Sequence, residues 1–241
     1  MNIVLTNDDG IDSLGLKKLE SVLTKYGNVY VVAPSVQQSG KACSISAFFG
    51  ITMNKIDNNH LSVDGTPVDC VEVACAMIDK KIDLVVSGCN SGYNLSQDVM
   101  YSGTCGACVQ ASLSKLPSIA FSVKSKDHFE QIDKYAEEVL DYIFENNLLD
   151  SSYFLNVNIP SEEAKGIKLT KIYEPIYESY YEILVDSKTN KYIIERKPIN
   201  QISNEDCDKV AVNNGYISIT PLSQNLFKEN IYKKVKAKFE K

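Results

Sequence analysis

The sequence feature that most constrains the fold is an alternation of short apolar runs with longer segments of helical periodicity. Apolar runs of strand length occur at Ile3–Thr6, Val29–Ala33 and Ile82–Val86. Between the first two, apolar residues recur at three- and four-residue steps from Leu16 to Tyr26, which is the spacing of one helix face. This order predicts βαβ units, and hence an α/β fold in which helices cover both faces of a parallel sheet.

The same alternation continues to about residue 160. Further strands are expected at Ser118–Val123 and Phe154–Ile159, and a hairpin is expected over residues 48–63. Helices are expected from Thr66 to about Lys80, from about Gly103, and over Asp127–Glu145. The segment Ser87–Tyr101 is expected to be a long polar loop, which in such a fold indicates either function or disorder.

After about Pro160 the pattern changes. Alternating Tyr-rich runs at Tyr180–Val185 and Lys191–Arg196 flank a polar turn, which predicts an extended hairpin arm. A two-stranded arm has little of its own to pack against, so we expect it to pair with another subunit. A last strand at Gly215–Pro221 and a basic amphipathic helix follow. At 241 residues the chain is short enough for one domain with such an appendage.

Composition excludes some function classes. The 25 Lys and Arg against 31 Asp and Glu give a net charge of −6, which argues against binding of nucleic-acid polymers. No apolar run approaches the roughly 20 residues that cross a bilayer, and the N-terminal residues become acidic too early for a signal peptide. With seven Cys, an odd number scattered through apolar stretches, we expect a reduced, cytoplasmic protein that makes no membrane contact.

Polar motifs follow three of the predicted strands. Asp8-Asp9-Gly10 follows the first, Ser39-Gly40 lies in the segment after the second, and the segment after the third contains Asn90 and Asn94. In an open parallel sheet, ligands bind at the carboxyl ends of the strands. Two adjacent carboxylates repel each other unless a cation lies between them, and oxygen donors without His or Cys favour Mg²⁺ or Mn²⁺ over Zn²⁺.

Each of these motifs also has a purely structural interpretation. Asp8-Asp9-Gly10 is typical of a turn with an Asx cap, Ser39 of a loop hydroxyl, and Asn90 of a left-handed turn residue. The convergence of polar, glycine-punctuated segments on one edge of the sheet is what favours a site.

A second candidate lies at Tyr101-Ser102-Gly103-Thr104, where the next helix is expected to begin. Free N–H groups at a helix start, beside two hydroxyls, can bind phosphate, although Ser102 could equally be a plain N-cap. Opposite a metal held by two aspartates, such a cradle indicates phosphoryl hydrolysis.

The Cys105-Gly106-Ala107-Cys108 motif allows a redox interpretation, because a helix start lowers thiol pKa values. Its place inside a helix, outside a thioredoxin-like βαβ context, argues against that interpretation. Neither His60 nor His128 lies in a strand-end loop, so nothing supports a histidine-based mechanism.

Taken together, the motifs resemble those of the SurE family of survival-protein nucleotidases. They occur in order along nearly the whole chain: Thr6-Asn7-Asp8-Asp9-Gly10, Val32-Ala33-Pro34 with Ser39-Gly40, Gly65-Thr66-Pro67 with Asp69-Cys70, Val86-Ser87-Gly88-Cys89-Asn90, Tyr101-Ser102-Gly103-Thr104, Asn156-Val157-Asn158-Ile159-Pro160, and Asp208 with Ala211, Gly215-Tyr216 and Thr220-Pro221-Leu222. Several spaced motifs together specify a family far better than one motif does.

The resemblance implies a Rossmann-like catalytic core over residues 1–160. Residues 161–241 would add a swapped hairpin arm, the last strand and the C-terminal helix, complete one domain and build a homodimer or homotetramer. The implied activity is that of a metal-dependent phosphatase acting on nucleoside monophosphates. By the family pattern one divalent ion would bind Asp8, Asp9, Ser39 and Asn90, the phosphate would bind Asn94, Ser102, Gly103 and Thr104, and Asp8, Asn7 and Ser102 would be catalytic.

The chain departs from the family pattern at a few positions. Ser96 replaces a frequent glycine, and Cys89, Cys105 and Cys108 stand where small or aliphatic residues are common, but none of these changes removes an expected ligand. We therefore expect a 5′-nucleotidase, with base preference, native metal, general base and turnover of 3′-nucleotides or short polyphosphate left open. A non-hydrolytic nucleotide-binding regulator is the second hypothesis.

Overall fold

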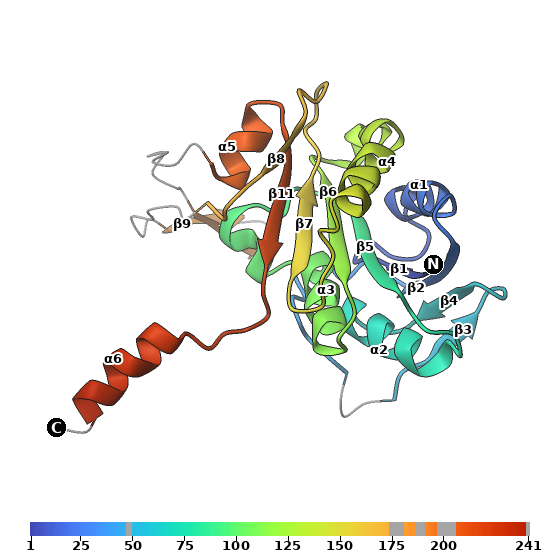
Figure 1. Ribbon diagram of the computed structural model, residues 1–241, viewed down its shortest axis with the longest axis horizontal. Helices are drawn as coiled ribbons and strands as arrows, with labels where there is room; N and C mark the ends of the chain where they lie inside the picture. Colours follow the sequence, from blue (N-terminus) through green and yellow to red (C-terminus); the bar gives the residue numbers. More distant parts are fainter. Residues whose placement is uncertain (47–49, 174–180, 187–190, 197–205, 240–241) are drawn as a thin grey trace.

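A computed structural model of the protein describes residues 1–46, 50–173, 181–186, 191–196 and 206–239 (Figure 1). Nine strands form one sheet in the order β3-β4-β2-β1-β5-β6-β7-β11-β8. Their bounds are Asn2–Thr6 (β1), Asn28–Pro34 (β2), Met53–Lys55 (β3), His60–Val63 (β4), Leu84–Ser91 (β5), Ser118–Val123 (β6), Phe154–Asn158 (β7), Ile167–Leu169 (β8) and Ile217–Leu222 (β11). The sheet is parallel except where β3 meets β4 and where β11 meets β7.

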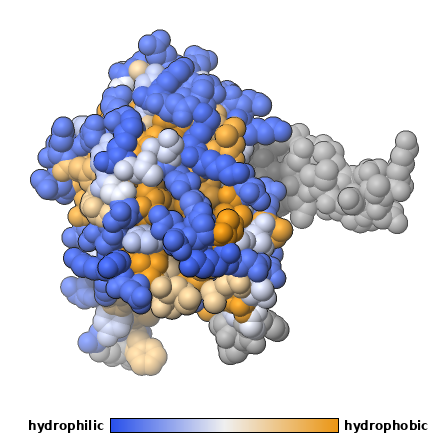
Figure 2. All heavy atoms as spheres, turned by 90° about the vertical axis from the view of Figure 1, so that its right-hand side faces the viewer, coloured by the Kyte–Doolittle hydropathy of each residue, from blue (hydrophilic) through white to orange (hydrophobic). Residues whose placement is uncertain are grey.

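Helices cover both faces of this sheet, as expected. Helices α1 (Leu14–Leu23) and α4 (Glu130–Glu145) lie on one face, and α2 (Pro67–Met77) and α3 (Gly103–Leu113) lie on the other (Figure 1). Along β1 the side chains alternate between the two cores: Ile3 and Leu5 pack with α1 and α4, and Val4 packs with α2. The outer surface on the α1 and α4 side is mainly hydrophilic, which matches two amphipathic helices (Figure 2).

The sequence explains where these helices begin. Ser13 caps α1 by accepting a hydrogen bond from the Leu16 amide. Thr66 and Asp69 form a reciprocal capping box on α2, and Pro67 stands at its first position, where a missing N–H carries no penalty. Short 3-10 turns occupy Ser96–Met100 (η1) and Lys126–His128 (η2).

Several predicted boundaries were wrong. Helix α2 ends at Met77 rather than near Lys80, and β5 runs on to Ser91, into the segment expected to be a loop. The first strand of the expected hairpin is Met53–Lys55, not Phe48–Met53, and residues 47–49 lie outside the described part. Strand β8 and helix α5 (Asp208–Asn213) were not predicted at all.

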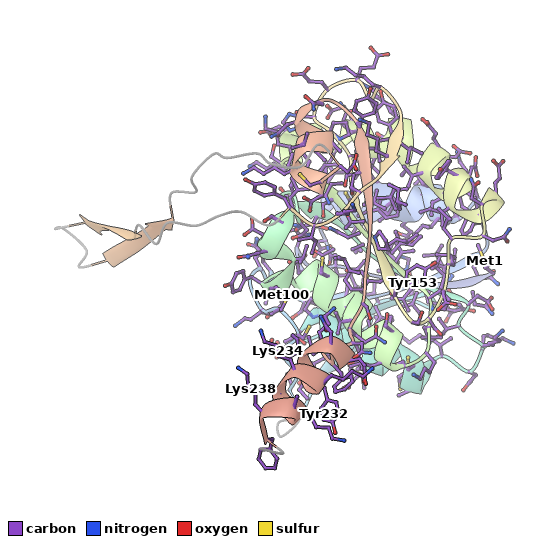
Figure 3. All side chains as sticks on the ribbon, turned by 60° about the vertical axis from the view of Figure 1, so that its left-hand side comes forward. Met1, Met100, Tyr153, Tyr232, Lys234 and Lys238 are labelled. Carbon is purple, nitrogen blue, oxygen red and sulfur yellow. The ribbon has the colours of Figure 1, made fainter. Side chains whose placement is uncertain are left out.

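The C-terminal part divides into two kinds of structure. Strands β8 and β11 complete the main sheet, because β11 pairs with β7. By contrast β9 (Tyr181–Asp186) and β10 (Lys191–Arg196) pair antiparallel in a separate two-stranded sheet, so the predicted hairpin is confirmed (Figure 3). Helix α6 (Glu229–Phe239) projects from the body, and none of its described residues is buried (Figure 1). Among the described residues, no helix has both the length and the apolar character required to span a bilayer.

Candidate functional site

The motifs that follow β1, β2 and β5 converge on one cavity at the carboxyl edge of the sheet. The cavity has a volume of about 250 Å³. Its lining contains five of the predicted site residues, Asp8, Ser39, Asn90, Asn94 and Ser102, and four that were not predicted as site residues, Gly40, Ser91, Asp98 and Tyr101. Asp9, Asn7, Gly103 and Thr104 lie behind this first layer and contact it as described next.

Asp8 is the most buried acid of the site, with 3% of its surface exposed. The Thr104 hydroxyl donates a 2.7 Å hydrogen bond to Asp8 Oδ1. Burial raises the pKa of Asp8 to about 6 despite this hydrogen bond, and the charge of Asp9 acts in the same direction. The Asp8 anion is therefore less favourable here than in water, and a nearby cation would stabilise it.

Asp9 is the next residue after Asp8, and its anionic form is also disfavoured. Its Oδ2 accepts a 3.0 Å hydrogen bond from the Ser91 amide, which ties the turn after β1 to the end of β5. Burial raises the pKa of Asp9 as well. Two neighbouring carboxyls that are both destabilised as anions form the electrostatic signature of a cation site.

Two neutral oxygens complete the donor set. Asn90 uses its Nδ2 to donate a 2.7 Å hydrogen bond to the Gly92 carbonyl, which fixes the amide group and leaves its Oδ1 for a ligand. Ser39 Oγ accepts a 3.0 Å hydrogen bond from Gln37. Among the described residues, no cluster of three or more His, Cys, Asp or Glu could hold a metal. The set of two carboxylates, one hydroxyl and one amide thus fits a hard, oxygen-preferring divalent ion.

The start of α3 faces these oxygens. Ser102 is the N-cap of α3, because its hydroxyl accepts a 3.1 Å hydrogen bond from the Cys105 amide, so the capping interpretation is correct. The amides of Gly103 and Thr104 have no acceptor among the described residues. A Cβ on Gly103 would lie 2.9 Å from Asp8 Cβ, so only glycine lets the helix start approach Asp8 this closely. The amides at the start of α3 can therefore bind an anionic ligand directly, and the carboxylates can bind the same ligand through a cation that lies between them and it.

Asn7 has a structural place behind the site. It is completely buried; its Nδ2 donates to the Gly10 carbonyl at 2.9 Å and its Oδ1 accepts from the Gly10 amide at 3.2 Å. The turn predicted for Asp8-Asp9-Gly10 exists, and Asn7 rather than an aspartate closes it. The Asp8 side chain is thereby left for the cavity, and the Asp9 side chain is left to bind the Ser91 amide.

An asparagine network that the residue-level reasoning missed holds Asn94. The backbone N–H of Asn94 donates a 2.9 Å hydrogen bond to Asn158 Oδ1. The backbone carbonyl of Asn94 accepts hydrogen bonds from Asn156 Nδ2 at 2.7 Å and from Asn158 Nδ2 at 3.1 Å. The signal was the alternation Asn156-Val157-Asn158, which places both amides on one face of β7. No sequence pattern identified Asp98 as a site residue, because it is a single acidic residue in a polar segment.

The cysteines do not support redox chemistry. Cys105 and Cys108 are buried free thiols, and burial raises the pKa of Cys105 to about 12, the opposite of what a reactive pair needs. His60 lies at the turn between β3 and β4, far along the sheet from this edge.

Comparison with known proteins shows which family the chain belongs to. The family described as "Survival protein SurE" matches residues 3–179. The 5′-nucleotidase SurE of Clostridium botulinum strain 657 (type Ba4) is 35% identical, with 99% of each chain covered. Its counterpart in strain Alaska E43 (type E3) is 34% identical over 92% of this chain and 93% of that protein. The crystal structure of the SurE protein from Aquifex aeolicus has a TM-score of 0.87 and 36% identity, and covers 98% of this chain and 99% of its own. The chain belongs to the SurE family.

Proposed function

We propose that this protein is a divalent-metal-dependent 5′-nucleotidase, a phosphomonoesterase that hydrolyses nucleoside 5′-monophosphates. The observation that carries the proposal is that Asp8 and the start of α3 at Ser102 line one cavity, with Asp9 next to Asp8 and the pKa of both aspartates raised by burial. Relatives named 5′-nucleotidase that match over 99% of the chain support the same reaction.

In the proposed mechanism, Asp8, Asp9, Ser39 and Asn90 would hold one Mg²⁺ or Mn²⁺ ion. When bound, such an ion polarises a phosphoryl oxygen and lowers the pKa of water. The amides of Gly103 and Thr104 and the side chains of Asn94 and Ser102 hold and orient the remaining phosphate oxygens. Thr104 fixes Asp8 through its 2.7 Å hydrogen bond, and Asn7 holds the turn that carries both aspartates.

The surroundings of this site support further parts of the proposal. Residues 1–160 supply every proposed ligand, and residues 161–241 complete the sheet and supply the hairpin and α6, through which we propose a homodimer or homotetramer. The odd number of cysteines, seven, scattered through apolar stretches supports a cytoplasmic location. Turnover of 3′-nucleotides and short polyphosphate belongs to the same proposal, because both present a terminal phosphate.

A direct test measures phosphate release from AMP with added Mg²⁺ or Mn²⁺ and with EDTA. We expect EDTA to abolish turnover and Asp8→Asn or Asp9→Asn to lower kcat by at least about a hundredfold, because electrostatic stabilisation of this kind is worth that much. Circular dichroism should show that both variants fold. Full turnover in either variant would defeat the assignment, and metal and AMP binding by calorimetry without any turnover would favour the regulator instead.

A further inference from the structure

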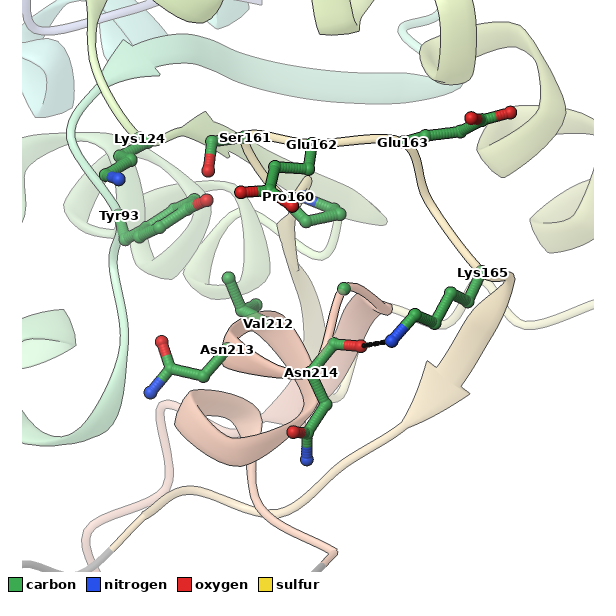
Figure 4. Close-up of a pocket in the computed structure, with 11 residues that line it drawn as sticks. Tyr93, Lys124, Pro160, Ser161, Glu162, Glu163, Lys165, Val212, Asn213 and Asn214 are labelled. Carbon is green, nitrogen blue, oxygen red and sulfur yellow. Dashed lines mark hydrogen bonds between the residues drawn. The ribbon is translucent and has the colours of Figure 1, made fainter.

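A second cavity, of about 280 Å³, opens at the same edge of the sheet (Figure 4). It lies where Lys124 follows the end of β6 and where Pro160 and Ser161 follow β7, and the last turn of α5 closes it with Val212 and Asn213. Tyr93 borders one side of the hollow and Asn213 the other, with Val212 between them (Figure 4). The cavity therefore lies at the junction of the N-terminal core and the C-terminal segment, where ligand sites are common.

This cavity is next to the candidate active site. Tyr93 lines the second cavity and its chain neighbour Asn94 lines the first, so the Tyr93–Asn94 segment separates the two. The segment is held rigidly, because both the amide and the carbonyl of Asn94 bond to asparagines of β7. A ligand whose phosphate lies at the start of α3 would have to extend past the Tyr93–Asn94 segment to reach this second cavity, which opens at the same edge of the sheet.

The lining of the second cavity is mostly polar, and Tyr93, Pro160 and Val212 form its apolar part. Pro160 and Val212 are buried apolar residues, and Tyr93 adds a half-buried aromatic side chain. The rim is charge-balanced, with Lys124 and Lys165 against Glu162 and Glu163. The Lys165 ammonium group also has a partner within the protein, because Nζ donates a 2.8 Å hydrogen bond to the backbone carbonyl of Asn214 (Figure 4). A second phosphate would find little net positive charge here, whereas a heterocycle would find an aromatic partner and the amide and hydroxyl of Asn213 and Ser161.

We infer that this second cavity is the nucleobase subsite of the enzyme and that Tyr93 is its stacking residue. The inference rests on the proposed nucleotidase function and specifies how that site distinguishes nucleotides from other phosphate esters. The base lies against the Tyr93 ring, and Asn213 and Ser161 offer hydrogen bonds to its edge. Base recognition therefore depends on the junction between residues 1–160 and the C-terminal segment, although all phosphate and metal ligands belong to the former.

The experiment compares AMP with ribose 5-phosphate, which carries the same reacting group without a base. Loss of one stacked base is worth about a tenfold or larger factor in binding, so Tyr93→Ala should raise KM for AMP about tenfold at similar kcat. The same variant should change kcat/KM for ribose 5-phosphate less than twofold, and Tyr93→Phe should stay within twofold of wild type on both substrates. Calorimetry with adenosine should show binding to the wild type and a loss in Tyr93→Ala.

Tyr153→Ala is the matched control, because it also removes a half-buried tyrosine but at the opposite end of β7, where the Tyr153 hydroxyl donates to Leu148. Its AMP to ribose 5-phosphate ratio should equal that of the wild type. An unchanged ratio in Tyr93→Ala overturns the inference, as does a loss of AMP selectivity in Tyr101→Ala alone, which would place the base over the first cavity. Absence of turnover with every ester would instead contradict the nucleotidase function, whereas adenosine binding would still report on the subsite.

Discussion

At the scale of single residues, Asp8 is positioned from two sides by α3. Thr104 donates to Asp8 Oδ1 at 2.7 Å, and the bare Cα of Gly103 allows the helix to come close, since a Cβ there would lie 2.9 Å from Asp8 Cβ and 3.2 Å from Oδ2. The same two residues begin the helix whose amides face the cavity. A change at Gly103 therefore moves the proposed metal ligand and the phosphate cradle against each other.

We predict that Gly103→Ala lowers kcat/KM for AMP by about tenfold to a hundredfold, because displacements of about 1 Å in an active site have effects of that size. The free energy of unfolding should change little, since the helix propensity of Ala exceeds that of Gly by about 1 kcal/mol and offsets part of the strain. Steady-state kinetics and urea unfolding measure the two effects. Gly50→Ala is the control, because a Cβ there meets nothing within 4 Å. Wild-type turnover in Gly103→Ala would contradict this packing.

His60 supplies a pH-dependent contribution away from the site. Its Nδ1 and Nε2 lie 2.9 Å from Asp57 Oδ1 and 2.9 Å from Glu20 Oε1. Burial alone would lower the pKa of His60, but the two carboxylates outweigh it and raise this pKa above its ordinary value. A group whose pKa is raised on folding stabilises the protein below its unfolded pKa, and this stability is lost as pH rises through the folded pKa.

We therefore predict that the difference in unfolding free energy between the wild type and His60→Gln is larger at pH 5.5 than at pH 8.5. The change should be about 0.5 kcal/mol or less, because the His60 side chain is 29% exposed and solvent screens the pair. Urea unfolding at both pH values measures it. His128→Gln is the control, since His128 contacts Ser125 and no carboxylate among the described partners. A difference that grows with pH would refute the assignment.

At the scale of elements, the capping box of α2 also secures the segment that follows β2. Asp69 accepts hydrogen bonds from the Thr66 amide at 2.8 Å and from the Ser46 amide and hydroxyl at 2.8 Å each. Burial would raise the pKa of Asp69, but these hydrogen bonds outweigh it and lower the pKa. One side chain thus starts a helix and anchors the segment that carries Ser39.

We predict that Asp69→Asn reduces the free energy of unfolding by about 1–3 kcal/mol, because both carboxylate oxygens accept hydrogen bonds and the NH2 group that replaces one of them cannot accept. The difference from wild type should shrink as pH falls through the lowered pKa of Asp69, since a depressed pKa contributes stability only above it. Denaturant unfolding at pH 7 and at pH 3 measures both effects. Asp64→Asn, at an exposed neighbouring position, should be neutral.

The elements that sequence reasoning found and missed differ in one physical respect. Strands such as Ser118–Val123 are buried on both faces and show as continuous apolar runs, so their prediction succeeded. Strand β8 has three residues at the edge of the sheet, and Leu169 is 72% exposed, so it carries no such pattern. The polar end of β5 hydrogen bonds to β6 despite its composition, and its Gly88–Cys89 peptide is cis, which no local pattern indicates.

The same distinction applies to the candidate site. The strand-end motifs predicted which residues gather at one edge, because parallel topology alone brings them together. The positions of Asp98, of the asparagine network that holds Asn94 and of the second cavity beside Tyr93 depend on how η1, β7 and α5 pack. That information lies in tertiary contacts rather than in any short motif.

At the scale of the whole molecule, the apolar residues of the C-terminal helix α6 are not covered by the described part of the same chain. Three exposed apolar residues recur every four positions along α6, namely Ile231, Val235 and Phe239, with exposed fractions of 57%, 57% and 90%; Phe227, 57% exposed, precedes the helix. A helix shorter than about 12 residues is marginal in water without packing partners. An exposed stripe of this kind is typical of a surface that another subunit covers.

We therefore predict that the wild type is an oligomer of the 26.8 kDa chain and that the double variant Ile231→Asp, Val235→Asp has a smaller mass by light scattering. Charges placed in the stripe would have to be buried without partners, which weakens the interface strongly. Lys238→Glu changes the net charge by the same two units, and its mass should equal that of the wild type. Deleting residues 180–196 tests the hairpin separately and should also reduce the mass. A wild type that runs as a monomer would contradict the assembly, whereas an oligomer that only the hairpin deletion disrupts would assign the interface to β9 and β10 and leave α6 solvated.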